Sequence, residues 1–240
     1  PPPPPPPPPP PASPPPPPPR PPLPTFRRQR QMCIRDSISA VQLLSAAGKT
    51  FVTGPSVNIY NGRSLNLFAE KGMKRWVLPV ELGLDTLKDM QSLRPEGVET
   101  EVIGLGRLPL AWSARCYTAR SHNLPKDDCQ FKCIDYPDGR ILETQEGQEF
   151  LVLNGIQTQS SLTHQALDSL PELQALGVDI LRISPQHDGT MRIVEIFDIA
   201  RNNNNIDDLS DNLLALIPHG VCNGYLVKMA GMDYGSGQAA

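Results

Sequence analysis

Between residues 49 and 103 the sequence alternates short β-prone runs with segments of helical spacing. The β-prone runs are 49–53, 75–78 and 99–103. The segments between them, 63–71 and 84–93, carry apolar residues three and four positions apart. Strands separated by helices pair in parallel, because each crossover returns the chain to the same end of the sheet. The alternation therefore predicts an α/β fold, either a doubly wound sheet or a (β/α) barrel.

The pattern resumes after a different middle section. We expect a β-hairpin over 140–157, a helix over 162–176, a strand over 178–183 and an amphipathic helix over 189–201. No Gly-x-Gly-x-x-Gly motif follows a predicted strand, so a dinucleotide-binding fold has no support. A complete barrel takes about 250 residues, and this pattern is roughly two βα units short of that. We expect a partial TIM-like (β/α) barrel that lacks its first βα units and carries an inserted β-hairpin and a cysteine-rich loop.

The first 37 residues have a different composition from the rest. Residues 1–24 contain 20 prolines, and such a run can form only polyproline II or disorder. Residues 27–37 have the sequence RRQRQMCIRDS, which is one reading frame of a common sequencing-library adapter. We therefore interpret 1–37 as an artefact, in preference to a ligand for proline-recognising domains or a basic nucleic-acid arm. The predicted domains are then a barrel fragment over 38–234 and a disordered tail over 235–240.

Charge and hydropathy limit the classes of partner. Residues 1–37 hold five of the 22 Lys and Arg residues and one of the 25 Asp and Glu residues, so the remaining 203 residues carry 17 and 24, a net charge of −7. Such an acidic body does not favour nucleic acid or an anionic membrane as partner. No apolar run approaches the ~20 residues of a membrane-spanning helix. We expect a cytoplasmic protein.

Three cysteines lie within 18 residues of one another, as Cys116-x12-Cys129-x3-Cys133. The surrounding stretch, 107–140, is rich in prolines and polar residues and is predicted to be a loop, with at most a short helix near 112–115. Loop thiols beside basic residues become thiolates, which bind zinc or iron–sulfur clusters.

Two metals compete for this set of ligands. Structural zinc sites usually contain two C-x2–4-C pairs, whereas here one ligand stands alone. A cluster generally takes four thiolates, and this loop supplies three. Cys222 is the remaining candidate for the fourth, although its apolar neighbours favour a packed cysteine.

Several polar residues follow predicted strands, where barrels place their binding groups. The substrate-binding candidates are Asn58, Tyr60, Asn61, Glu81, Arg115 and Arg120. The competing interpretations are a helix cap for Asn61, a packed ring for Tyr60 and a surface carboxylate for Glu81. The two arginines can hold an anionic ligand by paired hydrogen bonds, or only tune the charge around the cysteines. We expect the four histidines to be solvated.

The cysteine stretch and six shorter ones resemble one group of a known family. They are GRLPLAWSARCYTARSHNLPKDDC (106–129), VNIYN (57–61), RWVLPVEL (75–82), YPDGR (136–140), VLNGIQT (152–158), RISPQ (182–186) and CNGY (222–225). From about residue 47 to 233 the chain resembles the UbiV group of the collagenase-like U-32 peptidase family. The cysteine stretch is the most specific of these similarities.

The resemblance implies a barrel-like α/β chain with one [4Fe–4S] cluster, acting as a heterodimer with a UbiU-like subunit. Such pairs hydroxylate the ubiquinone precursor ring without dioxygen, using an organic hydroxyl donor such as prephenate. Three of the family's four cluster ligands correspond to Cys116, Cys129 and Cys133. The first ligand lies upstream of Ile38, and Cys33 does not replace it, so we expect this copy of the hydroxylase subunit to be N-terminally truncated and inactive.

Two other functions compete with this one. The family name implies a peptidase, but the sequence holds no G-x-S-x-G or H-E-x-x-H motif. A non-catalytic scaffold with zinc on the cysteines is the second alternative.

Overall fold

The computed structural model describes residues 34–35, 38–125, 128–202 and 206–235. Its elements are β1 (Ile34–Arg35), α1 (Ile38–Ala46), β2 (Phe51–Thr53), η2 (Pro55–Val57), α2 (Gly62–Glu70), β3 (Met73–Val77), α3 (Leu84–Ser92), β4 (Glu99–Trp112), α4 (Tyr117–Ser121), η4 (Lys132–Asp135), β5 (Arg140–Glu143), β6 (Glu149–Asn154), β7 (Gln157–Gln165), α5 (Leu170–Ala175), β8 (Ile180–Ile183), α6 (Thr190–Asn202), α7 (Asp207–Leu214) and β9 (Val221–Cys222). η2 and η4 are 3-10 helices.

The segment interpreted as an artefact lies outside the described residues, apart from Ile34 and Arg35. These two residues form β1, which pairs in parallel with β2. The predicted tail beyond 235 also lies outside the described part of the chain.

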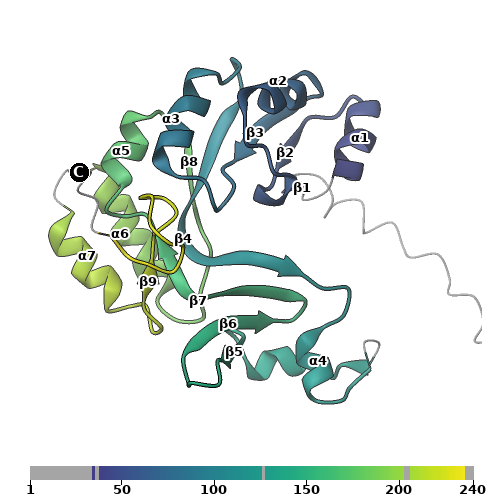
Figure 1. Ribbon diagram of the computed structural model, residues 1–240, viewed down its shortest axis with the longest axis vertical. Helices are drawn as coiled ribbons and strands as arrows, with labels where there is room; N and C mark the ends of the chain where they lie inside the picture. Colours follow the sequence, from purple (N-terminus) through teal and green to yellow (C-terminus); the bar gives the residue numbers. More distant parts are fainter. Residues whose placement is uncertain (1–33, 36–37, 126–127, 203–205, 236–240) are drawn as a thin grey trace, which may run out of the picture. The chain divides into compact units, whose positions relative to one another are not determined.

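The first half of the sheet is parallel, as the alternation predicts. Strands β1, β2, β3 and β4 lie in that order, and β8 pairs in parallel with the other side of β4 (Figure 1). Glu101 of β4 joins three of these strands, because its buried carboxylate makes ion pairs with Arg75 of β3 and Arg182 of β8. Breaking a buried ion pair by removing one partner typically costs about 3–5 kcal/mol.

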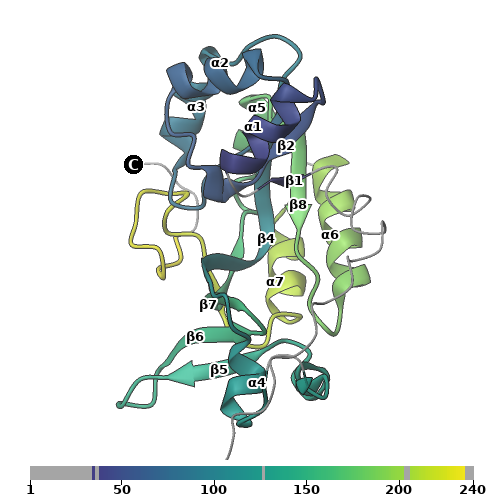
Figure 2. The same ribbon diagram turned by 90° about the vertical axis from the view of Figure 1, so that its right-hand side faces the viewer.

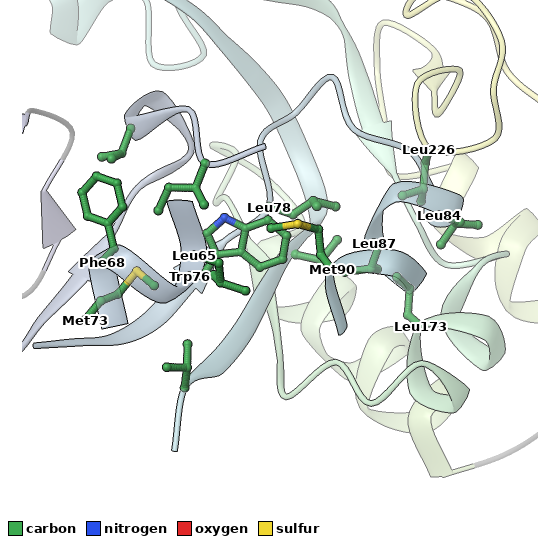
Figure 3. Packing of buried hydrophobic residues seen from close by; sticks show 14 of the residues in the cluster. Leu65, Phe68, Met73, Trp76, Leu78, Leu84, Leu87, Met90, Leu173 and Leu226 are labelled. Carbon is green, nitrogen blue, oxygen red and sulfur yellow. The ribbon is translucent and has the colours of Figure 1, made fainter. Parts of the chain in front are cut away.

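Apolar side chains from α2 and α3 pack against this parallel half (Figure 3). Trp76 of β3 is 1% exposed, and Leu65 of α2 and Leu87 of α3 are fully buried in the same cluster. Burying each such leucine stabilises the fold by about 2 kcal/mol relative to leaving it exposed. The apolar residues that give 63–71 and 84–93 their helical spacing therefore belong to one core, which lies on the sheet.

The second half of the sheet is antiparallel and begins within β4. From Leu105 onward this strand pairs with β7, which pairs in turn with β6, and β6 with β5. Figure 2 shows β5 and β6 beside α4, at one end of the described fold. The predicted hairpin over 140–157 is thus part of a larger antiparallel sheet.

The described strands form one open sheet of nine strands, with β8 attached to β4 and β9 to β7. The α/β class is confirmed, while the partial TIM-like barrel stays a prediction. Among the described helices, none has the length and apolar character needed to cross a membrane.

Two predicted elements are wrong. The helix over 162–176 is instead the end of β7 followed by the short helix α5, because β7 pairs with β4 along one edge and with β6 and then β9 along the other. Pro171 does not kink a helix but lies at its start, where the missing N–H is not needed. The loop predicted beyond residue 107 is also wrong up to Trp112, since β4 continues past Pro109 by shifting its register on both sides of this residue.

The amphipathic helix predicted over 189–201 is confirmed as α6. Ile193, Ile196, Phe197 and Ala200 are the buried members, and they pack with Leu105 and Leu167 among others. Met191 and Val194, two further apolar residues of this helix, are 74% and 41% exposed.

His164 of β7 is buried, at 7% exposed, so the expectation that every histidine is solvated is wrong. Its Nε2 lies 3.1 Å from the carbonyl oxygen of Ile103, and a carbonyl can only accept, so Nε2 carries the hydrogen. Burial lowers the pKa of His164 to about 4, because the charged imidazolium would lose its hydration.

This pKa predicts a loss of stability in acid. A histidine whose pKa falls from 6.5 in the unfolded chain to about 4 in the fold stabilises fully above pH 6.5, and this contribution is lost as pH falls toward 4. Between pH 7.5 and pH 5 the loss from His164 is about 2 kcal/mol. Urea denaturation at both pH values measures the difference in the free energy of unfolding between pH 7.5 and pH 5. In the His164→Gln variant this difference should be about 2 kcal/mol smaller than in the wild type. His187→Gln, at an exposed position, should keep the wild-type difference, and an equal difference in all three proteins would contradict the assignment.

Candidate functional site

The three clustered cysteines lie on one excursion of the chain, which we call the cysteine excursion and define as the segment between β4 and β5, residues 113–139. Its first part is held against the β6–β7 turn, because the amides of Ser113 and Tyr117 donate to the carbonyls of Ile156 and Gly155 at 2.8 and 2.7 Å. At its far end, Arg140 lies over the ring of Tyr136, 5.0 Å from the centroid. The excursion is therefore attached to the sheet at both ends.

All three thiols of the excursion are free. Cys116 is partly buried at the start of α4, where its Sγ accepts from the amide of Ala119 at 3.5 Å. Cys129 is partly buried, and Cys133 is exposed in η4. Within the described part of the chain, no three His, Cys, Asp or Glu side chains are gathered closely enough to hold a metal ion. The structure therefore places the three thiols on one segment without bringing them into one ligand set.

The backbone between Cys129 and Cys133 has an uncommon conformation. Gln130 and Phe131 both have positive φ values, of 50° and 51°, in the left-handed region that non-glycine residues rarely occupy. Each such residue costs about 1–2 kcal/mol, and the Phe131 side chain is 72% exposed and so recovers little of that by packing. Strained segments of this kind cluster at functional sites.

Cys222 lies far from the other thiols. It pairs with His164 near one end of β7, whereas Trp112, where the cysteine excursion begins, pairs with Gln157 at the other end. Seven residues of extended strand span about 23 Å. Cys222 is also 2% exposed, and burial raises the pKa of its thiol to about 11. The structure therefore supports a packed cysteine rather than a fourth ligand.

The donor set fits a soft metal centre in its chemistry. Three unpaired thiols on one polar segment are suitable ligands for an iron–sulfur cluster or for zinc. Cys222 belongs to the other end of β7, so the cysteine excursion supplies three of the four thiolates that a cluster generally takes.

A hollow of about 350 Å³ lies beside Cys116 and brings together both candidate arginines. Its lining is Arg115, Cys116, Ala119, Arg120, Leu124 and Pro125. We call it the arginine hollow. Two guanidinium groups beside a thiol give it a positive charge suited to an anion.

A second hollow, of about 470 Å³, lies where β2 and β3 end, and we call it the strand-end hollow. Its lining is Pro55, Ser56, Asn58, Val80, Glu81, Pro109, Leu110, Trp112 and Tyr225. Tyr60 borders Glu81, because its hydroxyl donates to Glu81 Oε1. This hydrogen bond to the carboxylate, together with burial, raises the pKa of Tyr60 to about 12. The candidate set thus divides into two places, with Asn58, Tyr60 and Glu81 at one and the two arginines at the other.

The chain's family is decided by comparison with known families. The family model described as peptidase family U32 matches residues 36–233, which is most of the chain. The chain belongs to peptidase family U32. No solved structure matches it.

Asn61 of this U32 chain has a structural role. Its side chain accepts from the amide of Ser64 at 2.9 Å and so caps α2. It does not line either hollow. The helix-cap interpretation therefore accounts for this candidate.

Sequence reasoning missed two residues of the strand-end hollow, Trp112 and Tyr225. Both are large aromatic side chains with substantial exposure, 55% and 41%. Trp112 was assigned to a loop, and Tyr225 was noted only as part of the CNGY stretch. Nothing in the sequence brings these two positions together, since they are 113 residues apart.

The cap predicts a stability effect at Asn61 without an effect on binding. Asn61→Ala should lower the free energy of unfolding by about 1 kcal/mol, whereas Asn61→Asp should keep it, because aspartate caps equally well. Urea denaturation measures both. A change in metal or ligand binding by the folded Asn61→Ala variant would show instead that Asn61 belongs to the site.

Proposed function

We propose that this U32 chain is a UbiV-type iron–sulfur subunit for the O2-independent hydroxylation of the ubiquinone precursor ring, acting with a UbiU-like partner. The observation that carries the proposal is the set of three free thiols on the cysteine excursion, separate from the buried Cys222. The organic hydroxyl donor would be an acid such as prephenate.

Cys116, Cys129 and Cys133 would hold the [4Fe–4S] cluster. When bound, this group supplies one-electron redox chemistry. The protein's own contribution is to hold the thiols and the backbone around them in place. The amide of Ala119 already donates to the sulfur of Cys116, which holds this side chain at the start of α4.

The arginine hollow would bind the acidic hydroxyl donor. Arg115 and Arg120 offer several N–H donors each, in a planar arrangement that matches carboxylate oxygens. Because Cys116 lines the same hollow, a carboxylate bound there lies next to a cluster ligand. Proximity of this kind is what a redox centre and its reactant need.

The geometry gives less support to hydrolysis. Among the described residues, no serine, threonine or cysteine side chain makes a hydrogen bond to a histidine, as an activated nucleophile would. Instead, the His219 side chain is hydrogen-bonded to Glu149, and the His122 side chain to Tyr136. A gelatin zymogram of the full chain tests this alternative, and clearing that persists after all three cysteines are replaced would overturn the redox proposal.

Anaerobic reconstitution with iron and sulfide tests the cluster directly. We expect the wild-type chain to retain iron and acid-labile sulfide in about equal amounts. Single Cys→Ala changes at 116, 129 or 133 should each lower both contents severalfold, because a cluster with two protein thiols is poorly held.

Cys222→Ala is the matched control and should retain the wild-type iron and sulfide contents. Loss of the cluster in this variant would instead identify Cys222 as a ligand. Zinc bound without sulfide would favour the scaffold alternative.

A further inference from the structure

We propose that the strand-end hollow binds a planar aromatic ring that carries a neutral hydroxyl group, with Trp112 and Tyr225 contacting the ring and Glu81 accepting from its hydroxyl. The identification of this ring as the substrate rests on the proposed function. Binding of the ring itself does not, because none of the three cysteines lines this hollow.

The size and place of the hollow suit a small ligand. Its volume of about 470 Å³ lies within the range of about 300–1,000 Å³ that is usual for small-molecule sites. Five of its nine lining residues belong to the segments that follow β2 and β3, at the carboxyl ends of parallel strands, and the others come from β4 and the segment after β9. Sheets of this type bind their ligands at that edge.

The two aromatic side chains of the hollow, Trp112 and Tyr225, leave a large part of their surface uncovered by the protein. Trp112 is 55% exposed at the end of β4, and Tyr225 is 41% exposed in the segment after β9. Both line the same hollow although they come from distant parts of the chain. Contact with another flat aromatic group stabilises exposed aromatic surface of this kind, because ring pairs attract each other beyond the effect of the area they bury.

Tyr225 is held in place by its own loop. A side chain at Gly231 would come within 2.5 Å of the Tyr225 ring, so only glycine allows the ring to lie there. The ends of the loop are joined by Asn223, whose side-chain amide exchanges two hydrogen bonds of 2.8 Å with the backbone of Gly235. Leu226, the next residue, is 3% exposed in the main core. The ring is therefore fixed before any ligand binds, which lowers the entropic cost of binding.

Glu81 supplies the polar contact. Its Oε1 accepts from Tyr60, and a carboxylate has about four acceptor positions, so capacity remains for a ligand. An ionised carboxylate favours a ligand with a hydroxyl donor and repels one with a negative charge. The strand-end hollow therefore selects a neutral phenol, while the arginine hollow selects an acid.

The two hollows are neighbours along the chain. Trp112 lines the strand-end hollow and Cys116 lines the arginine hollow. Four residues span at most about 14 Å between their Cα atoms. A ring held at Trp112 is thus kept within a short distance of the cysteine excursion.

Tryptophan fluorescence can locate the ligand, because the chain has only two tryptophans. Trp76 is 1% exposed in the core and Trp112 is 55% exposed in the hollow. Titrating the full chain, without reconstitution, with phenol should change the emission in a saturable way. Trp112→Phe should lose that change, whereas Trp76→Phe should keep it.

Calorimetry with phenol and anisole tests the contacts. Anisole has the same ring but no hydroxyl hydrogen, so wild type should bind phenol several times more tightly. Tyr225→Ala should weaken both ligands about tenfold, from the lost ring contact. Glu81→Ala should remove the preference for phenol, and Glu96→Ala, at an exposed carboxylate away from the hollow, should leave it unchanged.

The outcomes separate the two proposals. No saturable binding, or equal affinity for phenol and anisole in the wild type, would overturn the ring site. Binding of phenol that survives in the absence of iron and sulfide would support the ring site even where the cluster assay fails. A cluster on the three cysteines together with no phenol binding would leave the proposed function standing and reject this inference.

Discussion

The hydrogen-bonding requirement of one long strand, β4, determines how the rest of the chain is arranged. A strand of 14 residues carries a donor and an acceptor at nearly every position, and buried backbone groups must be paired. The first half of β4 meets this requirement with β3 and β8 in parallel, and the second half with β7 in the antiparallel sense. The change from one mode to the other occurs at Leu105, which pairs with both Ile183 and Gln165.

Two residues close to Leu105 permit the change from parallel to antiparallel pairing. Gly106 has φ +139°, and a side chain there would lie 2.4 Å from the Cβ of Ser184 as the chain leaves β8. Pro109, which cannot donate to a ladder, lies where the register shifts. Through this strand, the helix-covered core at one end is connected to the cysteine excursion at the other.

The sequence was most informative where local physics determines the structure. Asn61 caps α2 as its position after a strand and before an apolar-periodic segment predicts, and α2 and α3 follow the helical period. It failed at 157–165, a polar stretch that forms a strand because β4 pairs with one of its edges and β6 and β9 pair with the other. His164 was misjudged for the same reason, since the carbonyl that accepts from it is 61 residues away.

In the candidate site, too, features set by neighbouring residues could be predicted, whereas features set by the fold could not. Clustering of three thiols within 18 residues is visible in the sequence, whereas their separation from Cys222 depends on the length of β7. The arginines could be named from their places beside Cys116, because neighbours in sequence line the same hollow. Trp112 and Tyr225 could not be paired, because only the fold of β4 and of the loop after β9 brings them to one hollow.

Under the proposed function, the opposite charges of the two hollows would let one acidic protein bind two different reactants. Long-range repulsion by a net charge of −7 over residues 38–240 disfavours an anionic acid everywhere except near a local excess of positive charge. Arg115 and Arg120 provide such an excess beside Cys116, and Glu81 makes the strand-end hollow locally negative. An acid and a neutral phenol would therefore not compete for the same place. Under the proposed function, the five residues from Trp112 to Cys116 would separate the ring from the donor while keeping both beside the thiols.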